Sequence, residues 1–277
     1  MKYRMIAVDI DGTLLNPARE LEKETVEAAR RCMQEGAYFV LSSGRMPPAL
    51  SKIAKELNVN APAVCYNGGA VVDLMKGETL YSTPVPLDLA REIAKECEKL
   101  GLYLHAFVHG SYIAPYYCSL TKSYEQLCGV KATVVGGKIS EHLDEAPMKL
   151  LVLDTPTGAA KALPLLKAKF EGRASLMHSQ SHMIECVDIN TSKAGALEFL
   201  RRRLGVEQQE TCAFGDGQND LDMLDWAATA YVMENAPENV KAHNPRFRIA
   251  PPNSALGVAK VLMRALEEAT EEHTYDL

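Results

Sequence analysis

The feature that most limits how this chain can fold is a repeated order of short apolar strands and helices. Met5–Val8 is an apolar, partly β-branched run that ends abruptly in Asp9-Ile10-Asp11-Gly12-Thr13, which predicts a buried strand followed by a turn. A helical pattern over about 21–34 and two further strands at 37–41 and 63–66 follow, with short polar turns between them. This order predicts a parallel α/β sheet, in which ligands bind at the carboxyl ends of the strands.

The middle of the chain has a different pattern. Two short strands around Lys76-Gly77 lead to Pro84 and Pro86, which mark a boundary. Beyond it the sequence predicts a small α+β sheet domain, with helices at 87–100 and 158–170 and strands at 102–113, 150–153 and on either side of 178–182. The earlier order resumes with a helix at 194–204 and a strand at 211–214. We therefore expect a Rossmann-like doubly wound parallel sheet core at 1–84 and 187–277, interrupted by an inserted α+β cap domain at 85–186.

Length and charge limit the partners of the protein. The 277 residues are enough for about two domains. Lys and Arg number 30 against 36 Asp and Glu, so the formal net charge is −6 and the surface as a whole should attract neither nucleic acid nor a membrane. No apolar run approaches the ~18 residues of a membrane helix, so we expect a cytoplasmic protein. Seven scattered cysteines without a C-x-x-C spacing predict reduced thiols, and composition carries no prediction of the oligomeric state.

Acidic side chains follow two of the expected strands. Asp9 and Asp11 lie two residues apart after the first strand, and Gly12 lets the backbone bend there. The strand at 211–214 runs into Gly215-Asp216-Gly217-Gln218-Asn219-Asp220, which adds two carboxylates and an amide. Carboxylates crowded at one sheet edge repel one another unless a divalent cation neutralises them, and oxygen ligands suit Mg²⁺. A bound Mg²⁺ therefore explains both acidic segments.

A second group of residues is suited to holding an anion. Ser43 and Gly44 offer a hydroxyl and backbone N–H groups close to the start of a helix, and Lys193 lies just before the helix expected from about residue 194. Carboxylates with a metal on one side and these donors on the other describe a site that a phosphoryl group could bridge. Catalysis at such a site would be covalent, because a carboxylate can attack phosphorus to form an aspartyl-phosphate that water then hydrolyses.

Taken in this order, the segments resemble the four motifs of the haloacid dehalogenase (HAD) superfamily. The matching segments are D-x-D-G-T at 9–13, Ser43-Gly44-Arg45, Lys193, and G-D-x-x-N-D at 215–220. Their order and the insert resemble the Cof-type branch, the Cof-like hydrolases, which are bacterial phosphatases with a large α/β cap of the C2 type between the second and third motifs. The resemblance covers nearly the whole chain, and it implies a phosphoric monoester hydrolase.

The resemblance implies a role for each residue of the first two motifs. Asp9 would be the nucleophile and a Mg²⁺ ligand. Asp11 would be the general acid that protonates the leaving oxygen and then the base that activates water, with its backbone carbonyl on the metal. The Ile10 backbone, Ser43 and Gly44 would hold the transferred phosphoryl oxygens. The family often has Thr where this chain has Ser43, and the hydroxyl is retained.

The same resemblance implies roles for the last two motifs. Lys193 would neutralise the phosphoryl oxygens, orient Asp9 and stabilise the charge of the transition state. Asp216 would be a Mg²⁺ ligand, and Asn219 would bind the phosphate or Lys193. Asp220 would support the metal, either directly or through water.

Two other functions stay open beside a Mg²⁺-dependent phosphatase of small phosphorylated metabolites, such as sugar phosphates or nucleotide-related phosphates. A phosphosugar mutase of the capped HAD type would return the phosphoryl group to a second hydroxyl instead of water. A catalytically silent, metabolite-binding HAD protein would keep the fold and bind phosphorylated metabolites without turnover. The histidine pairs His105/His109 and His178/His182 could contact substrate or bind a metal, although exposed strand faces carry histidines without a function too.

Overall fold

The computed structural model describes residues 2–275, which separate into two compact units. The first unit takes in the described residues up to Ser43, the segment Ser51–Thr79 and the described residues from Ser192 onward. The second unit consists of Gly44–Leu50 and Leu80–Thr191. The domain boundaries expected at 85 and 187 stay a prediction, and each unit is described below by itself.

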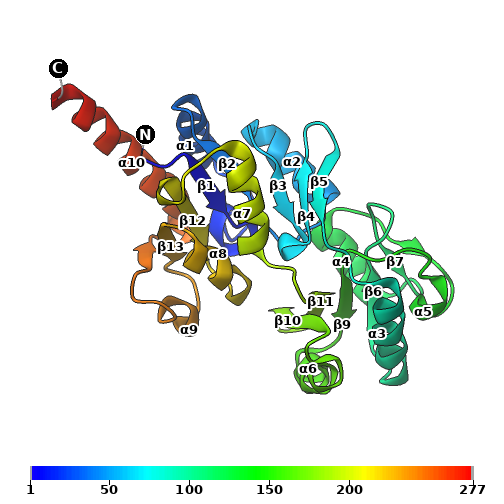
Figure 1. Cartoon of the computed structure of the whole chain (residues 1–277). Coiled ribbons are helices and arrows are strands. Elements are labelled where there is room, and N and C mark those ends of the chain that lie inside the picture. The colour runs from blue at the N-terminus through cyan, green and yellow to red at the C-terminus, as the bar shows by residue number, and fades with distance from the viewer. Residues whose placement is uncertain (1, 276–277) are drawn as a thin grey trace. The chain divides into compact units, whose positions relative to one another are not determined.

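The centre of the first unit is a parallel five-stranded sheet in the order β14-β13-β12-β1-β2 (Figure 1). Val8 lies opposite both Leu41 and Phe214 in this sheet. Since parallel strands in register end in one row, the residues that follow them are brought together at the carboxyl edge. The strands are β1 (Met5–Val8), β2 (Tyr38–Leu41), β12 (Thr211–Gly215), β13 (Thr229–Met233) and β14 (Arg248–Ala250).

Helices lie on both faces of this sheet (Figure 1). The chain moves in one direction along the sheet from β1 to β2 and in the other from β12 to β13, and right-handed crossovers then place the connecting helices on opposite faces. In α1 the buried residues Thr25, Ala28, Ala29 and Cys32 recur at helical spacing, which gives the helix its apolar face. The helices are α1 (Lys23–Gln34), α2 (Pro47–Leu57), α7 (Lys193–Leu204), α8 (Leu221–Trp226), α9 (Glu238–Lys241) and α10 (Gly257–Tyr275).

A small sheet of three strands, in the order β3-β4-β5, continues from the parallel sheet. A single parallel bridge between Ser42 and Val64 joins β2 to the first of these strands. Between the first two strands the chain makes a tight turn at Tyr66–Gly68. The strands are β3 (Ala63–Cys65), β4 (Ala70–Asp73) and β5 (Glu78–Ser82).

The second unit is built on a six-stranded sheet in the order β10-β11-β9-β6-β7-β8. One face of the sheet carries Leu104, Leu150 and Ile184, which form an apolar core with residues of α3, α5 and α6. The strands are β6 (Tyr103–Ala106), β7 (Ile113–Ala114), β8 (Thr133–Val134), β9 (Leu150–Leu153), β10 (Ala174–Gln180) and β11 (Met183–Asp188). The helices are α3 (Leu87–Lys99), α4 (Ser119–Cys128), α5 (Ile139–His142) and α6 (Pro156–Phe170).

The expected α/β fold class is confirmed, and the strand at 150–153 has the predicted bounds. Helix α4 is absent from the sequence-based expectation. It buries only Thr121 and Tyr124, and Cys118 stands at its N-cap instead of the usual Ser, Thr, Asp or Asn. Leu120, Tyr124 and Leu127 do recur at helical spacing in this segment, so what it lacks is a usual capping residue and not a periodic pattern.

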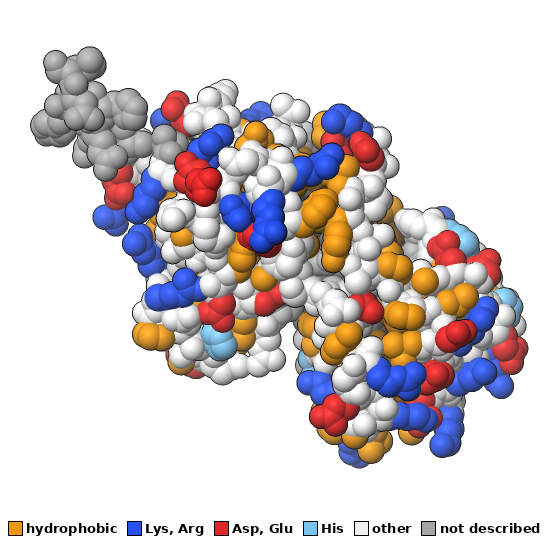
Figure 2. Space-filling model, in the orientation of Figure 1, with side chains coloured by type: hydrophobic (Ala, Val, Ile, Leu, Met, Phe, Trp, Pro, Cys, Tyr) orange, Lys and Arg blue, Asp and Glu red, His pale blue; other side chains and the backbone are white. Residues whose placement is uncertain are grey.

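Two surface properties bear on the expected partners. In the described part of the chain no helix is both long enough and apolar enough to span a bilayer. Acidic and basic side chains are interspersed over the face of the molecule in Figure 2. This mixture agrees with the small net negative charge of the sequence.

Candidate active site

The turn after β1 holds two carboxylates in different surroundings. Asp9 is 6% exposed, whereas the side chain of Asp11 is exposed. Gly12 has φ +84°, and a Cβ at this position would lie 2.2 Å from Oδ2 of Asp216. Glycine is therefore required here by both the left-handed backbone and the closeness of the 215–220 loop.

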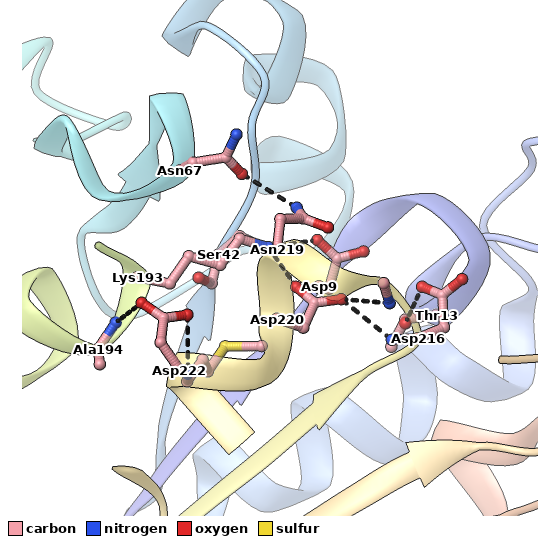
Figure 3. Close-up of polar contacts among 12 residues, drawn as sticks. Asp9, Thr13, Ser42, Asn67, Lys193, Ala194, Asp216, Asn219, Asp220 and Asp222 are labelled. Carbon is pink, nitrogen blue, oxygen red and sulfur yellow. Dashed lines mark hydrogen bonds and ion pairs between the residues drawn. The ribbon is translucent and has the colours of Figure 1, made fainter. Parts of the chain in front are cut away.

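Lys193 joins three segments that are far apart in the sequence. It is the first residue of α7, whose N-cap residue Ser192 accepts a hydrogen bond from the Gly195 backbone N–H. Lys193 is only 1% exposed. Its ammonium group donates to Asp9 Oδ1 at 2.7 Å and to Asp220 Oδ1 at 2.6 Å. It also donates to the carbonyl oxygen of Ser42 at 3.1 Å. Figure 3 shows this convergence at the carboxyl edge of the sheet.

The loop after β12 is folded around its own acidic side chains. Oδ2 of Asp220 accepts the backbone N–H groups of Asp216 at 3.0 Å and Gly217 at 2.8 Å. Oδ1 of Asp216 accepts a hydrogen bond from the Thr13 hydroxyl at 2.9 Å, and this bond ties the loop to the turn after β1. The side-chain amide of Asn219 donates to Oδ1 of Asn67 at 3.0 Å (Figure 3). These hydrogen bonds therefore tie the loop to the turn after β1 and to Asn67.

Asp9, Asp216 and Asp220 form an acidic cluster that fits a divalent cation. Each offers one carboxylate oxygen, and these oxygens lie within 4.8 Å of one another. Burial, reinforced by the Asp220 carboxylate, raises the pKa of Asp9 well above its ordinary value and raises the pKa of Asp216 to about 7. The cluster has three carboxylates, two of which contact its one ammonium group, so acidic oxygen donors outnumber positive charges. Mg²⁺ is suited to such a set of ligands.

The charge of Lys193 is held by the same cluster. Burial alone lowers the pKa of a lysine, but here the adjacent carboxylates of Asp220 and Asp9 outweigh burial. The pKa of Lys193 therefore lies above its ordinary value, and the side chain remains an ammonium group. A permanent positive charge at this position can attract a phosphoryl group as well as orient Asp9.

The remaining expected phosphate-binding residues are placed differently. Ile10 is fully buried in the turn after β1. Ser43 is also buried and directly follows Ser42, the residue that bridges β2 to β3. Its backbone N–H donates to the carbonyl oxygen of Val64. Gly44 belongs to the second unit, where its carbonyl oxygen accepts a hydrogen bond from Lys149 at 2.9 Å. The structure thus brings Asp9, Lys193, Asp216, Asn219 and Asp220 together, and the roles expected of these residues, as of Gly44, stay predictions.

Two residues of the site have no role in the sequence-based expectation. Thr13 lies within the D-x-D-G-T segment, so the motif itself carried the signal. Asp222 accepts the backbone N–H of Ala194 at 3.1 Å and that of Met223 at 2.8 Å, and it thereby fixes the first turn of the helix that begins with Lys193. A further acid two residues beyond Asp220 was visible in the sequence, but only the fold brings it to this helix.

The sequence was compared with known families and structures. Residues 6–262 match the haloacid dehalogenase-like hydrolase family. A Thermotoga maritima protein of known crystal structure is 29% identical, with 95% of this chain and 97% of that chain covered and a TM-score of 0.82. A haloacid dehalogenase-like hydrolase from Bacteroides thetaiotaomicron is 24% identical over 95% and 99% of the two chains, with a TM-score of 0.85, and shows the same fold.

A relative with a named activity is also similar over most of its length. The HMP-PP phosphatase of Serratia proteamaculans is 25% identical over 255 residues, which cover 89% of this chain and 89% of the relative. The expectations of superfamily, fold class and a phosphatase-type enzyme are confirmed. Over nearly its whole length, therefore, this chain is a member of the haloacid dehalogenase-like hydrolase family.

Proposed function

We propose that this chain is a Mg²⁺-dependent phosphatase that hydrolyses small phosphorylated metabolites through an aspartyl-phosphate on Asp9. The observation that carries the proposal is the position of the Lys193 ammonium, which contacts both Asp9 and Asp220. The cluster of Asp9, Asp216 and Asp220 supports the cation requirement. The Serratia proteamaculans relative, named as a phosphatase of HMP-PP, supports a phosphorylated small molecule as substrate.

In the first step, a carboxylate oxygen of Asp9 attacks phosphorus and the bond from phosphorus to the leaving oxygen breaks. Lys193 holds Asp9 Oδ1, so the attacking group is oriented before substrate arrives. The exposed side chain of Asp11 gives its proton to the leaving oxygen. Ser43, the Ile10 backbone and Asn219 bind the phosphoryl oxygens, and Lys193 neutralises their charge.

In the second step, a water molecule attacks phosphorus, Asp11 takes its proton, and the bond between phosphorus and Asp9 breaks. Free phosphate and the original Asp9 carboxylate result. Asp9, Asp216, the Asp11 carbonyl and Asp220 would hold Mg²⁺, directly or through water, and the ion would supply positive charge against the phosphoryl oxygens and relieve the repulsion among these carboxylates.

Replacement of the nucleophile tests the proposal. Asp9→Asn removes the attacking charge but keeps the shape of the side chain, so turnover of an aryl phosphate should become undetectable while the thermal midpoint stays close to that of the wild type. EDTA should abolish turnover by the wild-type protein. Turnover by Asp9→Asn, or turnover after complete removal of metal, would contradict the proposal. In the same assay with a phosphosugar, isomerised sugar in place of free phosphate identifies a mutase.

A further inference from the structure

The turn between β3 and β4 has an unusual backbone. Tyr66, Asn67 and Gly68 are consecutive residues with φ of 54°, 57° and 101°. Such angles are rare outside glycine and cost energy for a bulky residue such as tyrosine. A strained turn of this kind persists only where its surroundings hold it, so its neighbours indicate what it is for.

One neighbour is the segment that carries Lys193. A Cβ at Gly68 would lie 2.0 Å from the carbonyl oxygen of Ser192 and 2.8 Å from the backbone nitrogen of Lys193. Only glycine allows the turn to approach the start of α7 so closely. The turn therefore lies directly against the residue that precedes the catalytic-site lysine.

Asn67 contacts two other segments of the site. The residue is 4% exposed, and its backbone N–H donates to the carbonyl oxygen of Ser43 at 3.0 Å. Its side-chain Oδ1 accepts the amide N–H of Asn219 at 3.0 Å, as Figure 3 shows. One short turn thus touches the three segments that contain Ser43, Lys193 and Asn219, which are the residues expected to hold phosphate.

We infer that Asn67 is a positioning residue for phosphate binding, an inference that rests on the function proposed above. Its Oδ1 can only accept, so it fixes which end of the Asn219 amide faces the turn. One N–H of that amide is then satisfied, and the other is held in a fixed direction for a phosphoryl oxygen. The backbone N–H of Asn67 fixes the Ser43 carbonyl in the same way, and the left-handed backbone at 66–68 makes both bonds possible at once.

Asn67→Gly tests the side chain without disturbing the backbone, because glycine accepts positive φ freely. The matched control is Asn58→Gly, since Asn58 also has a positive φ, 56°, but is exposed. Binding of inorganic phosphate in saturating MgCl₂ is measured by calorimetry, with kcat and KM for an aryl phosphate beside it. Asn67→Gly should weaken phosphate binding about tenfold and raise KM more than it lowers kcat, as expected for one lost bond that orients a ligand group. Asn58→Gly should bind phosphate within about twofold of the wild type.

A double-variant cycle with Asn219→Ala tests whether Asn67 acts through Asn219. The loss in Asn67→Gly/Asn219→Ala should be about as large as that in Asn219→Ala alone. Losses that multiply, or wild-type phosphate binding by Asn67→Gly, would overturn the inference. Asn67→Ala, which removes the same accepting oxygen, is the second variant should the glycine variant not fold. It should likewise weaken phosphate binding about tenfold, and wild-type binding would overturn the inference equally.

The binding measurement separates this inference from the proposed function. A wild-type protein that binds phosphate but does not turn over phosphomonoesters refutes the phosphatase proposal, while the phosphate affinities of the variants still decide the role of Asn67. Conversely, normal turnover by the wild type with unaltered affinity in Asn67→Gly refutes only the positioning role.

Discussion

Among the residues whose burial the structure describes, each unit buries one lysine, and the two lysines differ in the charge that surrounds them. Lys193 in the first unit is 1% exposed, and Lys149 in the second is 2% exposed. Lys193 contacts Asp9 and Asp220, and Asp216 lies in the same cluster. The salt bridge found for Lys149 joins it to a single carboxylate, that of Glu185, at 3.0 Å.

The surroundings of Lys149 are those of a structural ion pair. Its ammonium also donates to the Gly44 carbonyl and lies 4.7 Å from the centre of the Phe107 ring. One positive and one negative charge balance there, so the pair is complete without a ligand. The cluster at Lys193 has more carboxylates than ammonium groups, and the repulsion among them contributes to the raised pKa values of Asp9 and Asp216. Excess buried acidic groups therefore distinguish the proposed cation site from the balanced ion pair of the second unit.

The largest expected effect comes from removing the lysine of the acidic cluster. Lys193→Met takes away the group that orients Asp9 and neutralises the phosphoryl oxygens, so kcat for an aryl phosphate should fall by ~10³-fold or more in saturating Mg²⁺. Steady-state kinetics on folded protein measure this, with Lys149→Met as the matched control for loss of a buried lysine. An equal loss of kcat in both variants would remove the distinction between the two lysines.

A smaller effect, on stability instead of catalysis, is expected in the second unit. Lys149→Met leaves Glu185 buried without its cation, which should lower the free energy of unfolding by roughly 3 kcal/mol. Lys149→Met/Glu185→Leu removes both charges and should recover most of that loss. Urea unfolding followed by circular dichroism measures both variants. A double variant no more stable than Lys149→Met would show that the lysine stabilises the unit by some other route.

Sequence reasoning was most successful where one local pattern suffices. Strands such as Met5–Val8 are buried on both sides in a parallel sheet, so they read as continuous apolar runs that end at a polar turn. The same reasoning predicted the edge at which Asp9 and Asp216 meet, because parallel strands in register end together, whereas the role expected of Lys193 came from the family resemblance. Helix α4 is missing from the expectation although Leu120, Tyr124 and Leu127 recur at helical spacing, because Cys118 at its N-cap is not a usual start signal.

The parts of the site that the sequence could not show depend on contacts between distant segments. Asn67-Gly68-Gly69 reads as an ordinary hairpin turn, and nothing local reveals that Asn67 meets Asn219, 152 residues away. Lys149 likewise looks like a solvated lysine within an apolar run. Burial beside Glu185 becomes visible only when the strands pair. Local patterns predict helices, strands and the sheet edge at which a site lies. Which side chains contact one another across distant segments becomes visible only in the folded structure.

The smallest expected effect concerns His105, which lies in the second unit near Lys149. Its side chain is fully buried beside the rings of Tyr103, Tyr112 and Tyr124. Neither ring nitrogen has a hydrogen-bond partner among the described residues. Burial, together with the nearby positive charge of Lys149, lowers the pKa of His105 to about 3 from an ordinary value of 6.5. This histidine therefore stays neutral in the folded protein.

The sign of the resulting pH effect follows from linkage. Below pH 6.5 the unfolded chain binds a proton at His105 that the folded protein does not, so folding stability falls as the pH drops toward 3. His105→Phe removes this loss, so between pH 7.5 and 5 the wild type should lose about 2 kcal/mol more than the variant. Urea unfolding at the two pH values measures the difference, with His142→Gln as the exposed-histidine control, and other titrating groups cancel because both proteins carry them. Equal losses of unfolding free energy in the wild type and in His105→Phe would contradict the prediction. They would mean that the buried imidazole binds its proton in the folded protein, so that burial and the charge of Lys149 do not keep it neutral.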